Sequence, residues 1–120
     1  MHVNFFDESP KPPEEVRIKN LGLYVYPDGR RIAVGFDITP FLERPSIEVK
    51  ITNARGEPAG ALNVIETLDA NFSLTMHLRD KEPTETYEIT ATLYYATPDT
   101  ERANVHTKTA SFDATQPGDQ

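Results

Sequence analysis

Apolar and polar residues alternate with a period of two along most of the chain. The clearest run extends from Ile32 to Ile38, where every second residue is large and apolar and the residues between are small or polar. Similar runs lie over residues 47–51, 72–78 and 87–93. This alternation is typical of antiparallel strands with one buried face, and the abundance of Val, Ile, Thr, Phe and Tyr agrees with it.

Turn-forming residues such as Pro27-Asp28-Gly29 and Thr97-Pro98-Asp99 separate these runs. The combined pattern predicts seven strands, over residues 16–26, 30–39, 46–53, 59–67, 71–79, 86–96 and 102–113. Short strands at this spacing predict an all-β fold, a seven-stranded antiparallel immunoglobulin-like β-sandwich.

Two predicted strands change phase along their length. In the first, Val16 and Ile18 share one parity, whereas Leu21 and Leu23 share the other. The last strand shows a similar slip between Val105 and Ala110. Two irregularities would explain such a change: a β-bulge, in which one extra residue moves the following side chains to the opposite face, or a strand that switches sheets.

The chain has the length of one domain, 120 residues. We divide it into a Pro-rich N-terminal tail over residues 1–15, a sandwich domain over 16–114 and a polar C-terminal tail over 115–120.

Tyr87 begins the sixth predicted strand, after a loop that contains Pro83. This position resembles the tyrosine corner of immunoglobulin-like and fibronectin type III modules. The resemblance implies that the Tyr87 hydroxyl bonds back to the backbone of the preceding loop. The chain lacks the core Trp and the Cys pair of many such modules, so we expect Phe36 to fill the place of the Trp. The resemblance concerns architecture alone, because this fold serves many functions.

Composition disfavours several classes of partner, covalent chemistry and cellular location. The net charge of −7 disfavours binding to nucleic acid or to an anionic membrane, and no apolar run is long enough to span a membrane. The absence of Cys excludes a disulfide scaffold and a thiolate site. Residues Met1 to Phe6 do not form a signal peptide pattern, so we expect a cytoplasmic protein. A secreted protein that has lost its signal is the alternative.

No catalytic set stands out in the sequence. His2, His77 and His106 lie on separate segments, and there is no Gly-x-Ser-x-Gly elbow. We therefore predict a protein that is not an enzyme and that has no catalytic residues, cofactor or metal. Calcium is the metal that its acidic loops would suit best, but the spacing of their carboxylates does not follow an EF-hand, and solvated loops explain them as well.

Three tyrosines are expected to point outward: Tyr24, Tyr26 and Tyr94. Outward tyrosines can stack on sugars or anchor a protein, although cross-strand packing would also explain them. Ala33, Gly35, Ser73 and Thr75 would form a small, flat outer face. Phe5 and Phe6 add apolar side chains in the tail. These could fold back onto a sheet or insert into a partner, although a disordered tail that happens to be apolar would also explain them.

These features predict a non-catalytic protein-interaction or structural module. Its candidate interaction surface consists of Phe5, Phe6, Tyr24, Tyr26 and Tyr94, and its partner is either an unidentified protein or a second copy of the chain. The alternative is a domain that binds a small ligand, either carbohydrate or calcium.

Overall fold

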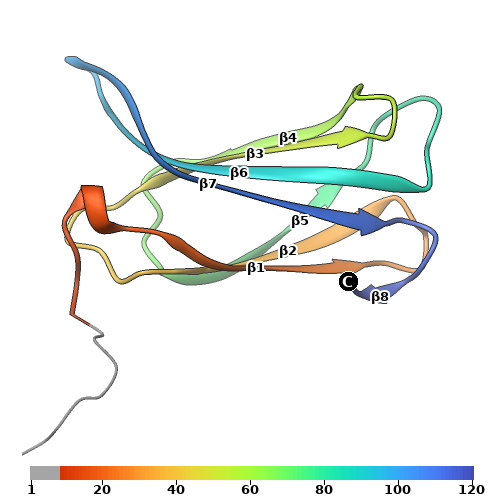
Figure 1. Cartoon of the computed structure of the whole chain (residues 1–120), viewed down its shortest axis with the longest axis horizontal. Coiled ribbons are helices and arrows are strands. Elements are labelled where there is room, and N and C mark those ends of the chain that lie inside the picture. Colours follow the sequence, from red (N-terminus) through yellow and green to blue (C-terminus); the bar gives the residue numbers. More distant parts are fainter. Residues whose placement is uncertain (1–8) are drawn as a thin grey trace, which may run out of the picture.

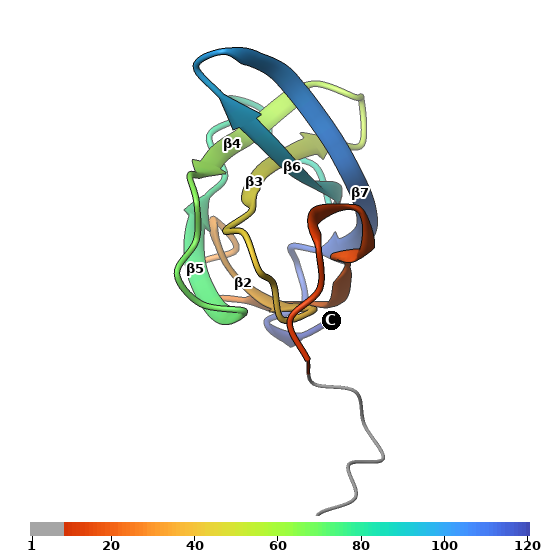
Figure 2. The ribbon, with the colours of Figure 1, turned by 90° about the vertical axis from the view of Figure 1, so that its left-hand side faces the viewer.

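A computed structural model describes residues 9–120 as two packed sheets of antiparallel strands (Figures 1 and 2). All seven predicted strands are present. An additional short strand follows them, and a 3-10 turn, η1, precedes them. The elements are η1 (Pro13–Glu15), β1 (Ile18–Val25), β2 (Arg31–Ile38), β3 (Ser46–Asn53), β4 (Pro58–Val64), β5 (Asn71–His77), β6 (Thr86–Thr97), β7 (Thr100–Asp113) and β8 (Gly118–Asp119).

The strands form two four-stranded sheets, in the orders β5-β2-β1-β8 and β4-β3-β6-β7. The pairs β1–β2, β3–β4 and β6–β7 are hairpins within one sheet, whereas the chain crosses between sheets after β2, β4, β5 and β7. This arrangement confirms the predicted immunoglobulin-like sandwich.

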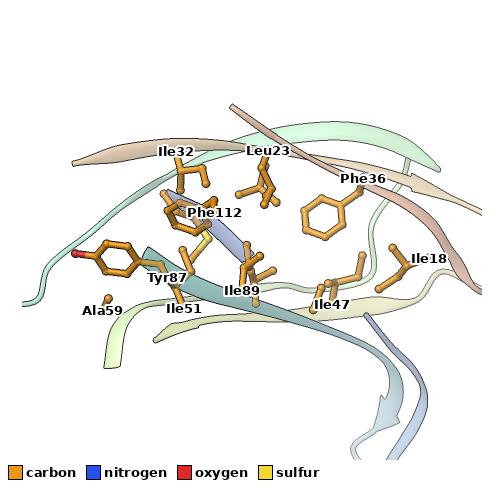
Figure 3. Close-up of a cluster of buried hydrophobic side chains, with 14 of the residues drawn as sticks. Ile18, Leu23, Ile32, Phe36, Ile47, Ile51, Ala59, Tyr87, Ile89 and Phe112 are labelled. Atoms are coloured by element: carbon orange, nitrogen blue, oxygen red, sulfur yellow. The ribbon is translucent and has the colours of Figure 1, made fainter. Parts of the chain in front are cut away.

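The core lies between the sheets and consists of the apolar residues of each alternation (Figure 3). In β2, Ile32, Val34, Phe36 and Ile38 are at most 3% exposed, while the residues between them are partly exposed. Phe36 stacks on Phe72 of β5, with ring centroids 5.0 Å apart. Burial of this continuous apolar layer is the main force that holds the two sheets together.

Both phase changes are β-bulges rather than changes of sheet. The pairing of β1 with β2 shifts between Ile18 and Asn20, so Ile18 and Leu23 both face the core although their parity differs. In β7, His106 pairs with Leu93 while Asn104 pairs with Tyr94, which leaves Val105 as the extra residue. The bulge in β1 decides which residues of that strand reach the outer face.

The two predicted tails contain structure in their described parts. Lys11 forms a bridge with Phe41 of the β2–β3 loop, and the 3-10 turn η1 lies in the same tail. At the other end, β8 pairs with β1, and the backbone N–H of Gln120 donates to the carbonyl of Leu23 (3.1 Å). Both segments are short and show no alternation of apolar and polar residues. Their conformation is set by hydrogen bonds to neighbouring backbone and not by burial of an apolar face.

Among residues 9–120, none of the helical segments has the length and apolar character to cross a membrane.

Candidate functional site

The outer face of the β5-β2-β1 sheet is built from rows of paired residues. Antiparallel partners share a face, so the pairing fixes which side chains lie together. One row consists of Tyr24, Ala33 and Thr75; the next of Gly22, Gly35 and Ser73; and the third of Asn20, Asp37 and Asn71. The predicted small outer residues Ala33, Gly35, Ser73 and Thr75 are thus brought together, beside Tyr24.

A shallow hollow of about 410 Å³ lies over the second and third rows. We call it the glycine trough. Its lining includes six residues of the outer face: Asn20, Gly22, Gly35, Asp37, Asn71 and Ser73. The adjoining Phe36 and Phe72 complete its border. A Cβ atom added to Gly22 would meet nothing within 4 Å, and one added to Gly35 would meet only the Gly22 carbonyl, at 3.9 Å. The space above the floor is therefore free of the protein's own atoms.

Tyr24 and Tyr26 form an aromatic pair next to the trough. Their rings pack edge to face, with centroids 5.5 Å apart, and the Arg31 guanidinium lies 4.5 Å from the centroid of the Tyr26 ring. The Tyr26 hydroxyl lies 3.5 Å from the hydroxyl of Thr75 on β5, so the Tyr26 side chain reaches across β2. Tyr24 keeps 42% of its surface exposed. The pair therefore presents one accessible ring on a fixed support.

Polar side chains occupy the opposite end of the trough. The Asn20 amide donates to the Asp37 carboxylate (3.1 Å), and the Lys19 ammonium lies 3.7 Å from the same carboxylate. Asn71 and Ser73 are exposed on β5. This end offers amide and hydroxyl groups that can both donate and accept hydrogen bonds, next to a carboxylate whose charge is already paired.

On the outer face of the other sheet, neighbouring side chains cover Tyr94. The Arg102 guanidinium lies 4.0 Å from the centroid of the Tyr94 ring and also bonds the Glu48 carboxylate (3.1 and 3.2 Å). The hydrogen bond from Arg102 lowers the pKa of Glu48. The Tyr94 hydroxyl donates to Asn63 (2.7 Å), and Tyr94 is only 6% exposed. Tyr94 lies on the opposite sheet from Tyr24 and Tyr26, so the three tyrosines do not form one surface.

A buried polar cluster lies at the end of the sandwich where β5 leads into β6. The Tyr87 hydroxyl donates to Asp80 (3.0 Å) and accepts from the Thr84 backbone N–H (3.3 Å), which belongs to the β5–β6 loop. Asn53 donates to the same carboxylate, and the Arg30 guanidinium lies 3.3 Å from it. This loop-to-strand contact is the type found in the tyrosine corner.

Asp80 is engaged on both carboxylate oxygens. Burial alone would raise its pKa, but the hydrogen bonds from Asn53 and Tyr87 and the charge of Arg30 outweigh burial and lower the pKa. This carboxylate of the acidic β5–β6 loop is therefore held in the fold by Arg30, Asn53 and Tyr87 and is not free to bind a cation. Among residues 9–120, no group of three or more His, Asp or Glu side chains could hold a metal ion.

The two described histidines, His77 and His106, lie on strands of different sheets. His77 is exposed at the end of β5, and the His106 Nδ1 atom accepts a hydrogen bond from the Ile18 backbone N–H (2.9 Å). His2, Phe5 and Phe6 lie outside the described residues.

The sequence pattern had not identified Asn20, Gly22, Asp37 and Asn71 as site residues. Gly22 could have been found from its parity, because it lies two positions before Tyr24 and must share its face in a continuous strand. Parity also places Asp37 on the face of Gly35 and Asn71 on the face of Ser73, but only the register between the strands shows that Asn20, Asp37 and Asn71 form one row.

No protein-family model and no curated protein matches this sequence. Solved structures with a similar fold include a glycosyl hydrolase family 2 member from Bacteroides cellulosilyticus DSM 14838, with a TM-score of 0.54 and 9% identity over 82% of this chain. A β-glucuronidase from Ruminococcus gnavus, solved with C6-substituted uronic isofagomine, has a TM-score of 0.48 and 13% identity over 82% of this chain. The chain spans 15% and 16% of the length of these two proteins. The likeness to the first shows a shared all-β sandwich fold.

Proposed function

We propose that the chain is a non-catalytic binding module that holds its ligand on the outer face of the β5-β2-β1 sheet. The observation that carries the proposal is the contrast between the outward tyrosines of the two sheets. Arg102 covers Tyr94 on one face, whereas the other has an exposed Tyr24 beside an open floor at Gly22 and Gly35. A binding surface needs accessible groups that the protein does not itself saturate.

The hydrogen bonds of His106 and Asp80 support a non-catalytic role. Nucleophilic catalysis needs a base next to a nucleophile and a group that orients the base. The ring nitrogen Nδ1 of His106 is occupied by the Ile18 N–H, and the Asp80 carboxylate is held by Tyr87 and Asn53. These groups stabilise the sandwich and are not free to act on a substrate.

The proposal is tested by a thermal-unfolding screen with sugars, nucleotides, divalent metals and common metabolites. A ligand at one hundred times its dissociation constant adds about 2.7 kcal/mol of stability, which shifts the unfolding midpoint by several degrees in a domain of this size. We expect a ligand that shifts the wild type, does not shift Gly22→Val, and still shifts Ser111→Val. Ser111 is an exposed position on β7, so this variant adds the same side chain on the other sheet. A shift that survives in Gly22→Val would contradict the proposed face.

A second candidate is a structural module within a longer protein. It is supported by the Bacteroides cellulosilyticus structure, in which a segment with this fold makes up 15% of the chain. The shared fold does not carry that protein's activity to this chain. If this role is correct, the screen should give no ligand for the outer face, and Gly22→Val should leave every function of the longer protein unchanged.

A further inference from the structure

The floor of the glycine trough is unusual for the middle of a sheet. Gly22 and Gly35 pair with each other in a stretch of continuous register, and neither has a positive φ. Glycine in the interior of a strand lowers stability relative to other residues, and it often marks a place where a ligand or another backbone approaches closely. The presence of two paired glycines is explained neither by a turn nor by a bulge, and the space above them is open.

The two ends of the trough supply different chemistry. Tyr24 lies two residues from Gly22 on the same face and presents a ring that is 42% exposed. Packing against Tyr26 holds this ring, and Tyr26 is in turn held by Arg31 and Thr75. A ring that is already ordered offers an apolar surface at a low cost in conformational entropy. At the other end, Asn20 and Asn71 provide amide groups that bond hydroxyls as donors and as acceptors.

The charges beside Tyr26 and Asn20 are paired within the protein, and Asp119 of β8 adds a carboxylate to the row of Tyr24. Arg31 contacts Asp28 at 2.7 Å, and Lys19 lies 3.7 Å from Asp37. An anionic ligand would have to separate these pairs. Among residues 9–120, the four large aliphatic side chains with the most exposure all lie outside β1, β2 and β5: Leu42, Leu62, Ile65 and Leu68. The core of a protein interface is apolar, so this face is better suited to a neutral ligand that carries hydroxyl groups.

The length of the face favours more than one sugar ring. Tyr24 lies four positions after Asn20 along β1, and four steps at the usual rise of a strand correspond to about 13 Å. A β-linked pyranose chain with equatorial hydroxyls is flat, has apolar ring faces and carries its hydroxyls at the edges. Such a chain could stack one ring on Tyr24, lie over Gly22 and Gly35, and direct hydroxyls to Asn20, Asp37 and Asn71.

We propose that the glycine trough binds a neutral, β-linked oligosaccharide. Tyr24 is the stacking residue, the two glycines form the floor, and Asn20 and Asn71 are the main hydrogen-bonding residues. This inference rests on the proposed function, because it names the class of ligand for the same face.

The test is a titration of the isotope-labelled full chain with cellotetraose, xylotetraose and chitotetraose, followed by amide NMR signals. Tetragalacturonate serves as the anionic comparison. We expect at least one neutral sugar to shift the amide signals of Gly22, Gly35 and Asn71. We expect Tyr24→Ala to weaken its binding at least tenfold and Gly22→Val to abolish it, while Ser111→Val binds as the wild type does. Native-like spectra of each variant without sugar show that the fold is intact.

The other outcomes overturn the inference in distinguishable ways. Binding of tetragalacturonate alone would exclude a neutral ligand. Shifts confined to residues outside the trough, or binding that survives Gly22→Val, would exclude this site. If the sugars have no effect but another ligand from the thermal screen shifts the trough signals, the saccharide is wrong and the proposed function stands. If no ligand of any class shifts these signals, both are wrong.

Discussion

The Tyr87 hydroxyl holds together three segments at one end of the sandwich. It donates to Asp80, accepts from the Thr84 backbone, and lies 3.4 Å from the Arg30 guanidinium. Replacing Tyr87 with Phe keeps the ring, which stacks on Phe112, but removes a donor to a buried carboxylate. A buried group that loses a partner costs about 1–3 kcal/mol, so Tyr87→Phe should lower the free energy of unfolding by that amount in urea.

Tyr95→Phe is the matched control for this substitution. The Tyr95 hydroxyl donates only to the Glu43 carbonyl (3.1 Å), and burial together with the Glu43 charge raises the pKa of Tyr95 to about 12. One neutral hydrogen bond contributes about 1 kcal/mol, so the control should lose less stability than Tyr87→Phe. Equal losses in the two variants would show that Asp80 does not depend on Tyr87.

His106 gives the sandwich a pH dependence near neutrality. Its Nδ1 atom must be unprotonated to accept the Ile18 N–H, and burial, followed by the charges of Arg17 and Lys108, lowers its pKa. The unfolded chain therefore takes up the proton first as the pH falls. The contribution of His106 is complete above about pH 6.5, the ordinary pKa of the group, and decreases as the pH falls toward the folded-state pKa.

The measurement is the unfolding free energy of wild type and His106→Gln between pH 7.5 and 5.5. Gln can still accept the Ile18 hydrogen bond but does not titrate, so the wild type should lose more stability than the variant over this interval. The carboxylates with lowered pKa values, such as Asp80 and Asp113, lose their contribution only at more acidic pH. A constant difference between the two proteins would contradict the assignment.

At the scale of the elements, a side chain should have opposite effects on stability at the strand residue Gly22 and at the turn residue Gly29. Gly22 lies in regular strand with open space at its Cβ position, whereas Gly29 has a φ of 65° and would bring a Cβ to 3.0 Å from the Ala114 carbonyl. Gly22→Ala should therefore stabilise the protein by about 0.4–1 kcal/mol, and Gly29→Ala should destabilise it by at least about 1–2 kcal/mol. Thermal unfolding of both variants checks the two signs, and a loss of stability in Gly22→Ala would show that the trough floor is tighter than its geometry indicates.

The strands themselves were predictable because their information is local. Alternation such as that of Ile32, Val34 and Phe36 requires no knowledge of neighbouring segments. The phase change near Lys19 located the irregularity in β1, and the pairing with β2 shows that it is a bulge. Strand β8 has two residues and no alternation, and its position follows only from its pairing with Tyr24 and Val25. A sequence pattern cannot identify an element of this kind, because another segment determines its conformation.

At the scale of the whole molecule, the site depended on how the strands are combined. The sequence indicated Tyr24 and Tyr26 together with the small residues of β2 and β5, and those residues share one face. It did not show that Arg102 covers Tyr94, since the bulge at Val105 sets the register between β6 and β7. Parity predicts the face on which a side chain lies, but the register decides which neighbour covers it.

The C-terminal residues connect the fold of the whole molecule to the candidate site. Gly118 and Asp119 pair with Val25 and Tyr24, and Gln120 bonds both the Leu23 carbonyl and the Asp113 backbone N–H. Removing residues 115–120 would leave the outer edge of β1 without its partner beside Tyr24. Loss of these few hydrogen bonds should lower the free energy of unfolding by about 1–3 kcal/mol.

The unpaired edge should also increase self-association, because exposed strand edges pair with one another. Urea unfolding measures the first effect, and light scattering at increasing protein concentration measures the second. Gln116→Ala is the control, since it changes the same segment at an exposed side chain and keeps β8 in place. Wild-type stability and mass in the truncated chain would mean that β1 keeps its conformation without β8, and Tyr24 would then be held by its side-chain contacts to Tyr26 alone.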